Sequence, residues 1–122
     1  MEAPPAIVLF AHGSRDERWR APIEAVARRA SERDASARVV CAYLELTEPD
    51  LRTAFGALVA EGSRSVRIVP VFLGMGRHVR EDLPRLVDEL RTAYPQVDVA
   101  LMPAVGEDPE VIDLLARKAL GP

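Results

Sequence analysis

The fold is decided by residues 6–14, AIVLFAHGS, in which a continuous apolar run ends in a histidine and a glycine. An apolar run without polar residues at alternate positions is typical of a parallel strand that is covered on both faces. Runs of this kind predict four buried strands, at Ala6–Ala11, Arg38–Leu44, Ser65–Leu73 and Val97–Pro103. Proline cannot donate to a sheet ladder, so Pro70 indicates an edge or a bulge in the third strand.

Between and after these runs, apolar residues recur three and four positions apart, which predicts four amphipathic helices. We expect the apolar face of each helix to pack in the core. In chain order these faces contain Trp19, Ile23, Val26, Ala27 and Ala30; Leu51, Ala54, Phe55, Leu58 and Val59; Leu83, Leu86, Val87 and Leu90; and Ile112, Leu115 and Ala119.

Local signals predict where the later helices begin. Thr47 and Asp50 have the spacing of a capping box, so the second helix should begin there with Pro49 in its first turn. A proline is tolerated near the start of a helix, which places the start of the third helix close to Pro84. The fourth helix should open at Asp108, which precedes a proline.

The predicted order alternates strand and helix four times, in units of about thirty residues. This order predicts the α/β class: a four-stranded, mostly parallel sheet with helices on both faces and right-handed crossovers. With 122 residues and no linker or low-complexity segment, we expect one domain spanning residues 1–122.

Composition excludes several classes of protein. A net charge of -3 argues against a general binder of nucleic acid or anionic membranes. The sequence contains no apolar run of about 18 residues that could span a membrane. The single cysteine, Cys41, excludes a disulfide framework and a cysteine-based zinc site, and favours a reducing, cytoplasmic compartment.

Ligands of open α/β sheets bind at the carboxyl ends of the strands, so the polar residues there are candidates for function. His12, Glu45 and His78 follow the first three strands, and we expect both histidines in loops at the same edge. Glu45 lies between two leucines, where a buried acid is costly unless it is paired. Two imidazoles and a carboxylate suit Co, Fe, Ni or Zn, and provide bases near neutral pH. Each residue could also be structural, with the histidines hydrogen-bonded and Glu45 bound to an arginine or a helix end.

Arginine is the second candidate feature, because the sequence has fifteen arginines and one lysine. Five of the arginines follow the first and third strands and would surround the predicted cleft: Arg15, Arg18, Arg20, Arg77 and Arg80. Guanidinium groups bind carboxylates and phosphates in bidentate fashion, so a polycarboxylate or phosphate ligand fits. The bias could also reflect genome base composition alone.

Other occupants of this architecture lack their motifs here. The sequence has neither a P-loop nor a GxGxxG after the first strand. A receiver domain would need an aspartate at the end of an early or central strand and a later lysine, and neither is present in such a position. A histidine phosphatase ends its first strand in Arg-His-Gly. Ala11 stands where that arginine would be, so this class is only an alternative.

The stretches AHGSRD (11–16), YLEL (43–46), VPVFL (69–73) and GRHVREDLP (76–84) resemble the sirohydrochlorin chelatases, the small class II chelatases of cobalamin and siroheme biosynthesis. Proline in the third strand is typical of that family. The resemblance implies a lyase that inserts Co2+, Fe2+ or Ni2+ into sirohydrochlorin, with the metal as substrate and no permanent cofactor. A non-catalytic carrier of metal or tetrapyrrole is the alternative from another class.

The resemblance also implies roles for particular residues. His12 would bind metal and accept a proton, His78 would be the second metal ligand, and Glu45 would lie beside metal and macrocycle. The tetrapyrrole would contact Gly74, Met75, Gly76, Arg77, His78 and Val79, with Ser14 nearby. Arg15 and Arg77 are candidates for binding its carboxylates. Because long members of the family carry two such domains, this short chain would act as a homodimer.

Overall fold

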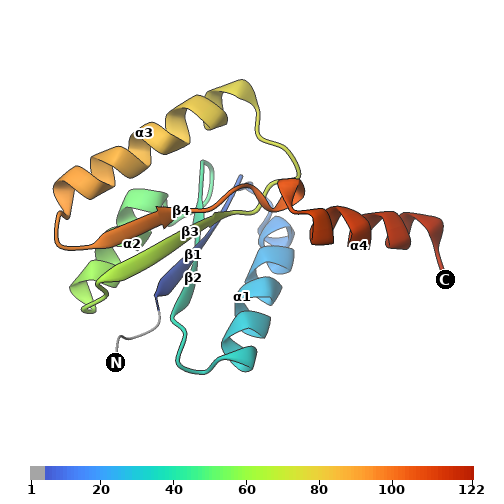
Figure 1. The fold of residues 1–122 in the computed structure, drawn as a ribbon, viewed down its shortest axis with the longest axis horizontal. Coiled ribbons are helices and arrows are strands. Elements are labelled where there is room, and N and C mark those ends of the chain that lie inside the picture. Colours follow the sequence, from blue (N-terminus) through green and yellow to red (C-terminus); the bar gives the residue numbers. More distant parts are fainter. Residues whose placement is uncertain (1–4) are drawn as a thin grey trace.

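Four parallel strands and the helices between them make up residues 5–122, the part of the chain that the computed structural model describes. The strands are β1 (Ala6–Ala11), β2 (Val39–Tyr43), β3 (Ser65–Pro70) and β4 (Asp98–Leu101), and their order in the sheet is β2-β1-β3-β4 (Figure 1). The helices are η1 (Glu17–Arg20), α1 (Ala21–Arg33), α2 (Leu51–Ala60), α3 (Arg77–Ala93), η2 (Val105–Glu107) and α4 (Pro109–Leu120). This arrangement confirms the predicted α/β class. Residues 1–4 of the predicted domain lie outside the described residues.

Helices cover both faces of the sheet, as expected (Figure 1). On one face, α2 and α3 pack against Val8 and Phe10 of β1, which are almost completely buried. On the other face, Ile23 of α1 packs against Leu9 of β1 and Val39 of β2. Successive strand residues point to opposite faces, so β1, which pairs with β2 and β3, contributes to both layers of the core.

Pro70 lies neither at a sheet edge nor in a bulge, so that expectation is wrong. It is the last residue of β3, is almost completely buried, and pairs in continuous register with Phe10 of β1. The next residue, Val71, donates its N–H to the Phe10 carbonyl at 2.7 Å, so the Pro70 nitrogen faces the β4 side. β4 has already ended at Leu101, and the proline therefore removes no hydrogen bond from the sheet.

Two residues expected in the core of the first helix are exposed. Trp19 lies in η1 and is 59% exposed, and Val26 on α1 is 48% exposed, whereas Ile23 is buried. Helix α1 lies over β1 and β2, and its apolar stripe is wider than the surface that these strands offer. Residues at the margin of the stripe therefore remain exposed.

The predicted capping box at the second helix is also wrong. The Asp50 carboxylate accepts the Thr53 N–H at 2.9 Å, so Asp50 itself is the N-cap of α2. Pro49 therefore precedes the helix, and the Thr47 hydroxyl is free for another contact. The predicted apolar face is confirmed, with Phe55 and the other expected residues buried or packed against the core.

Helix α3 begins at Arg77, so Pro84 lies inside the helix rather than near its start. Pro84 is exposed, and the Arg80 carbonyl that loses its helical donor is on an exposed residue that water can reach. The expected packing of Leu83, Val87 and Leu90 is confirmed. His78 therefore lies in the first turn of a helix, so the expectation that it lies in a loop is wrong.

The expected burial of α4 is wrong. Asp108 caps the helix as predicted, but no residue of α4 is buried, and Ile112, Leu115 and Ala119 are exposed. The helix projects away from the sheet instead of covering it (Figure 1).

The fourth strand is shorter than expected and is half-exposed, because it forms the edge of the sheet. Within residues 5–122, no helix is long and apolar enough to cross a membrane.

Candidate functional site at the carboxyl ends of the strands

His12 and Glu45 lie side by side where β1 and β2 end. The pairing of these strands continues into the loops, because Leu44 donates its N–H to Ala11 at 2.8 Å and Glu45 donates to the His12 carbonyl at 3.1 Å. The side chains meet with 3.6 Å between His12 Nε2 and Glu45 Oε1. The structure therefore brings together two of the three predicted site residues.

Both members of this pair are open to solvent, with 53% of the His12 side chain and 54% of the Glu45 side chain exposed. Glu45 was expected to be partly buried between apolar neighbours, and this is wrong, since Leu44 and Leu46 are themselves 39% and 55% exposed. The strand ends at Tyr43, and the three residues after it leave the core. The carboxylate is thus available to a ligand at little desolvation cost.

Gly13 makes the approach of the two loops possible. Its φ is +95°, and a Cβ on this residue would lie 1.9 Å from the Glu45 carbonyl oxygen. A side chain would therefore push the loop after β1 away from the loop after β2. The glycine that follows His12 thus holds the pair together through backbone packing.

The Thr47 hydroxyl ties the same two loops together. It accepts the Ser14 N–H at 2.9 Å and donates to the Ser14 carbonyl at 2.6 Å. The predicted substrate contact Ser14 is therefore half-buried, with its backbone engaged. Thr47 was expected to cap a helix, so its positioning role was missed.

His78 and Glu45 line one hollow of about 540 Å3, which we name the α3 hollow. Its lining residues are Phe10, Leu44, Glu45, Arg52, His78, Val79, Asp82, Leu83, Arg85, Leu86 and Glu89. His78 and Asp82 are four residues apart on α3 and so lie on one face of the helix. Asp82 was missed because the third helix was expected to begin later, which hid this spacing.

His12 lines a second hollow of about 430 Å3, which we name the α1 hollow. Its lining residues are Ala11, His12, Arg18, Trp19, Pro22, Ile23, Val26, Tyr43, Val71 and Phe72. Burial raises the pKa of Tyr43 to about 12, so its phenol stays protonated at neutral pH. The His12–Glu45 pair thus stands between an apolar hollow and one with several charged groups.

His12, Glu45 and His78 do not form a closed metal site. In the described part of the chain, no three His, Cys, Asp or Glu side chains lie close enough to hold one metal ion. Their assignment as joint metal ligands therefore stays a prediction. An imidazole beside a carboxylate is nevertheless a pair that can bind a divalent ion loosely or accept a proton.

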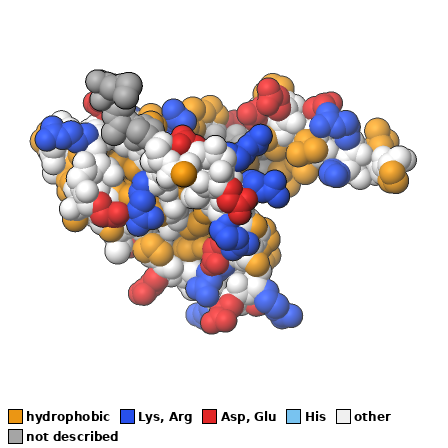
Figure 2. Space-filling view, turned by 90° about the horizontal axis from the view of Figure 1, so that it is seen from below, with side chains coloured by type: hydrophobic (Ala, Val, Ile, Leu, Met, Phe, Trp, Pro, Cys, Tyr) orange, Lys and Arg blue, Asp and Glu red, His pale blue; other side chains and the backbone are white. Residues whose placement is uncertain are grey.

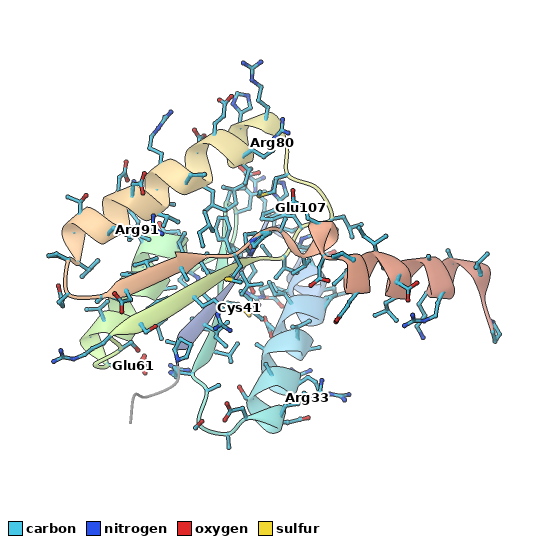
Figure 3. The ribbon with its side chains drawn as sticks, viewed as in Figure 1. Arg33, Cys41, Glu61, Arg80, Arg91 and Glu107 are labelled. Atoms are coloured by element: carbon cyan, nitrogen blue, oxygen red, sulfur yellow. The ribbon has the colours of Figure 1, made fainter. Side chains whose placement is uncertain are left out.

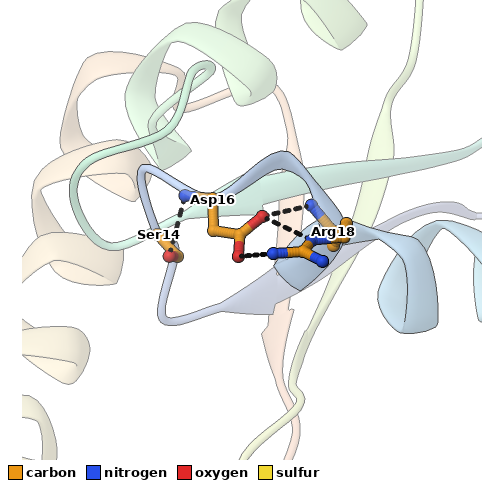
Figure 4. Close-up of polar contacts among 3 residues, drawn as sticks. All are labelled: Ser14, Asp16 and Arg18. Carbon is orange, nitrogen blue, oxygen red and sulfur yellow. Dashed lines mark hydrogen bonds and ion pairs between the residues drawn. The ribbon is translucent and has the colours of Figure 1, made fainter.

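Three of the five candidate arginines are engaged in ion pairs. Arg18 binds Asp16 through two side-chain contacts of 3.3 Å, and the Asp16 carboxylate also accepts the Arg18 N–H (Figure 4). These bonds hold the pKa of Asp16 below its usual range. Two further pairs join Arg20 to Glu24 and Arg77 to Glu81.

Arg15 and Arg80 are exposed and have no ion pair in residues 5–122. Figure 3 shows Arg80 on the first turns of α3, at the same edge of the sheet as Glu107 and opposite Glu61. Arg15 and Arg77 were predicted to bind substrate carboxylates. Arg15 is exposed, whereas the Arg77 guanidinium already forms an ion pair with Glu81.

The predicted tetrapyrrole segment serves two purposes in the structure. Met75 and Val79 pack against the core and fix the segment, although Val79 also lines the α3 hollow. A Cβ on Gly74 or Gly76 would meet nothing within 4 Å, so these glycines leave open space at the edge. Gly76 is also the N-cap of α3.

Fold and candidate site together define a small parallel α/β protein with its candidate functional groups at the edge where the strands end. The sequence profile of the CbiX family matches residues 6–120, and the chain belongs to this family. It is 29% identical to a sirohydrochlorin ferrochelatase of Priestia megaterium over 93% of this chain and 42% of the relative. It is 33% identical to a sirohydrochlorin cobaltochelatase of Methanococcus aeolicus over 67% of this chain and 57% of the relative. The chain thus spans about half the length of these curated relatives.

Among solved structures, the chain is similar to a putative cobalamin biosynthesis CbiX protein from Marinobacter aquaeolei VT8. The TM-score is 0.80 and the sequence identity is 34%, and the match covers 96% of this chain and 94% of the other. The fold therefore agrees with that of a family member of similar length.

Proposed function

We propose that this protein is a chelatase, a lyase that inserts Co2+ or Fe2+ into sirohydrochlorin in cobalamin or siroheme biosynthesis. The observation that carries the proposal is the 3.6 Å approach of His12 to Glu45, beside a hollow that Glu45 shares with His78. Family membership supports it, as do the names of the relatives, which cover both metals.

Metal insertion exchanges one dication for two protons, which leave two pyrrole nitrogens. Glu45 and His12 are placed to accept these protons, because both are exposed and neither is locked into a closed site. His78 enters from α3 on the side of the α3 hollow, where it would hold the incoming ion. The metal is the substrate, so loose binding by two imidazoles and a carboxylate favours its transfer.

The carboxylates of the macrocycle need cationic partners outside this proton-accepting group. Arg15 and Arg80 fit this role, since both are exposed without an ion pair of their own in the described residues. Arg77 is a weaker candidate because it already binds Glu81. Surface ion pairs contribute little free energy, so a substrate carboxylate can replace this one.

We further propose that the protein works in the cytoplasm as a homodimer. Cys41 is half-buried, and the sequence has no second cysteine with which it could form a disulfide. This supports a reducing compartment. This chain covers 42% of one longer relative. Two copies would therefore provide about as many such domains as the longer relative contains in one chain.

The decisive test measures metal insertion by visible absorption under anaerobic conditions, with sirohydrochlorin and Co2+, Fe2+ or Ni2+ supplied in turn. We expect insertion well above the spontaneous rate, and a loss of about 100-fold or more in His12→Ala and in His78→Ala. Saturable binding of metal or tetrapyrrole without acceleration would indicate a carrier instead. Undiminished insertion by both variants would remove these residues from the site.

A further inference from the structure

Leu46 combines two costly features directly beside Glu45. Its φ is +63°, and within residues 5–122 it is the one residue other than glycine with a positive φ. This left-handed conformation is disfavoured for a leucine because its Cβ crowds the following carbonyl oxygen. The residue is also 55% exposed and belongs to neither cluster of the core. The folded chain therefore strains this leucine without burying it.

The backbone around Leu46 accounts for its conformation but not for its side chain. On one side, Glu45 donates its N–H to the His12 carbonyl at 3.1 Å. On the other side, the Thr47 hydroxyl is bonded to the backbone of Ser14. Both neighbours of Leu46 are thus anchored to the loop after β1, and the chain must turn between them. A glycine would adopt this φ without strain and an asparagine with little, so nothing in the fold requires a leucine here.

Exposure of an apolar side chain is by itself a weak indication of function. Figure 2 shows hydrophobic side chains along the projecting helix α4 as well, between charged ones. Leu46 differs from these because its backbone is strained and because it is the next residue after a candidate catalytic group. Strained residues cluster at active sites and ligand clamps, where the strain is part of the working structure. The combination therefore points to a contact with a molecule outside the chain.

The molecule that covers Leu46 has to be one that also reaches Glu45. In the proposed function, the Glu45 carboxylate accepts a proton from a pyrrole nitrogen at the centre of the macrocycle. Consecutive Cα atoms are about 3.8 Å apart, so the neighbours of Glu45 would lie below the pyrrole rings that surround this centre. Leu44 is 39% exposed and lines the α3 hollow with Glu45, whereas Leu46 lines neither hollow. An acceptor between two apolar residues matches a macrocycle with N–H donors at its centre and apolar rings around them.

We propose that Leu46 is a substrate-binding residue whose side chain packs against the face of the sirohydrochlorin macrocycle beside Glu45. This inference rests on the proposed function, because it takes the tetrapyrrole as the ligand. Binding removes the exposed leucine from water, and this gain offsets the strain that the free chain carries. The contact is the same before and during metal insertion, so Leu46 raises the affinity for the macrocycle and leaves the chemical step unchanged.

The test measures binding of metal-free sirohydrochlorin to the full chain, followed by the visible absorption of the macrocycle. Leu46→Asn is the decisive variant, because asparagine has the same branching, tolerates the left-handed conformation and is polar. We expect its dissociation constant to rise at least 10-fold. The KM of insertion should rise with it, while kcat stays within about two-fold of the original value. Leu46→Met, which keeps an apolar side chain, should retain most of the affinity.

A second pair of variants separates binding from stability. Leu46→Gly should weaken binding as Leu46→Asn does without lowering the urea midpoint, because relief of the strain offsets the extra freedom of glycine in the unfolded chain. Gly62→Ala is the matched control. Its φ is +102°, its new Cβ would meet nothing within 4 Å, and it precedes β3 at the other edge of the sheet. This variant should lower the urea midpoint and leave the affinity for sirohydrochlorin unchanged.

The outcomes distinguish this contact from the proposed function. Insertion with unchanged affinity and KM in both Leu46→Asn and Leu46→Gly would overturn the contact alone. Binding by the original chain without accelerated insertion would overturn the chelatase function alone, and weaker binding by Leu46→Asn would then still support the contact. Unchanged affinity with a lower mass in light scattering would assign Leu46 to a contact between chains and overturn the proposal. A chain that binds no sirohydrochlorin would overturn both.

Discussion

The Thr47 hydroxyl binds both sides of Ser14, accepting its N–H at 2.9 Å and donating to its carbonyl at 2.6 Å. These residues are 33 positions apart and belong to the loops that follow β1 and β2. His12 and Glu45 lie two residues before them in the same loops. This hydroxyl therefore helps to fix the relative position of the two candidate catalytic groups, together with the backbone hydrogen bonds between the two loops.

Thr47→Val tests this dependence, because it keeps the shape of the side chain and removes the hydroxyl. We expect a loss of about 1–3 kcal/mol in the free energy of unfolding, since the Ser14 N–H loses its partner. Metal insertion should fall further than the loss of folded protein explains. Urea unfolding and insertion assays on the same sample check this. Thr92→Val, which removes a hydroxyl bonded within its own helix, is the control and should leave insertion unchanged.

Gly13→Ala should disrupt the approach of the same two loops. The new Cβ would meet the Glu45 carbonyl at 1.9 Å, and the residue would have to keep a φ of +95°. We expect a destabilisation of about 1–3 kcal/mol in urea unfolding, together with loss of insertion. Gly74→Ala is the matched control, because its Cβ meets nothing within 4 Å and should cost much less. Equal costs for the two variants would contradict the role given to Gly13.

Glu45→Gln removes the negative charge beside His12 and keeps the size of the side chain. We expect insertion to fall by about 100-fold or more, since the amide can neither accept a proton nor bind a dication as a carboxylate does. Stability should hardly change, because the Glu45 side chain is 54% exposed. Glu48→Gln, an exposed change in the same loop, should leave the rate unchanged. A full rate in Glu45→Gln would place the proton acceptor elsewhere.

Asp50 should make the stability of α2 depend on pH. Hydrogen bonds from the Thr53 side chain and backbone hold the pKa of Asp50 below its ordinary value of 3.8. A lowered pKa in the folded state means that the contribution is present above pH 3.8 and is lost as pH falls below it. Asp50→Ala should thus cost about 1 kcal/mol at pH 7 and progressively less in acid.

Urea unfolding of the Asp50 variants at pH 7 and at pH 3 provides the measurement. Asp50→Asn is the control, because its side-chain oxygen still accepts the Thr53 N–H without carrying a charge. Its cost at pH 7 should be smaller than that of Asp50→Ala. A cost for Asp50→Ala that grows in acid would contradict the assignment of Asp50 as a charged cap.

Local patterns were sufficient to predict most of the fold and to place His12 and Glu45 at one edge of the sheet. The apolar run Ala6–Ala11 is a strand with the predicted bounds, and His12 and Glu45 follow adjacent strands as expected. Such features depend on side-chain periodicity and on the rule that parallel strands end at one edge of the sheet. Both can be read from the order of residues in the chain.

The spatial role of individual residues was beyond these patterns. Pro70 was predicted to lie at an edge or a bulge because proline has no N–H donor, which the sequence shows directly. The sequence does not show that β4 ends beside Pro70, so that no partner strand needs this donor. Thr47 has the spacing of a helix cap, but its hydroxyl is used by a loop 33 residues away. Ion pairs such as that of Arg77 with Glu81 likewise decided which arginines stay open.

The sequence by itself determined the α/β order and the family, because periodicity and motifs are properties of neighbouring residues. Only the tertiary structure decided that His12 touches Glu45, that His78 lies in a helix, and that α4 leaves its own sheet uncovered. An amphipathic helix has the same sequence pattern whether its apolar face packs on its own chain or remains exposed. The choice depends on contacts between segments far apart in the chain, such as the close packing of Gly106 against Leu73 at the root of α4.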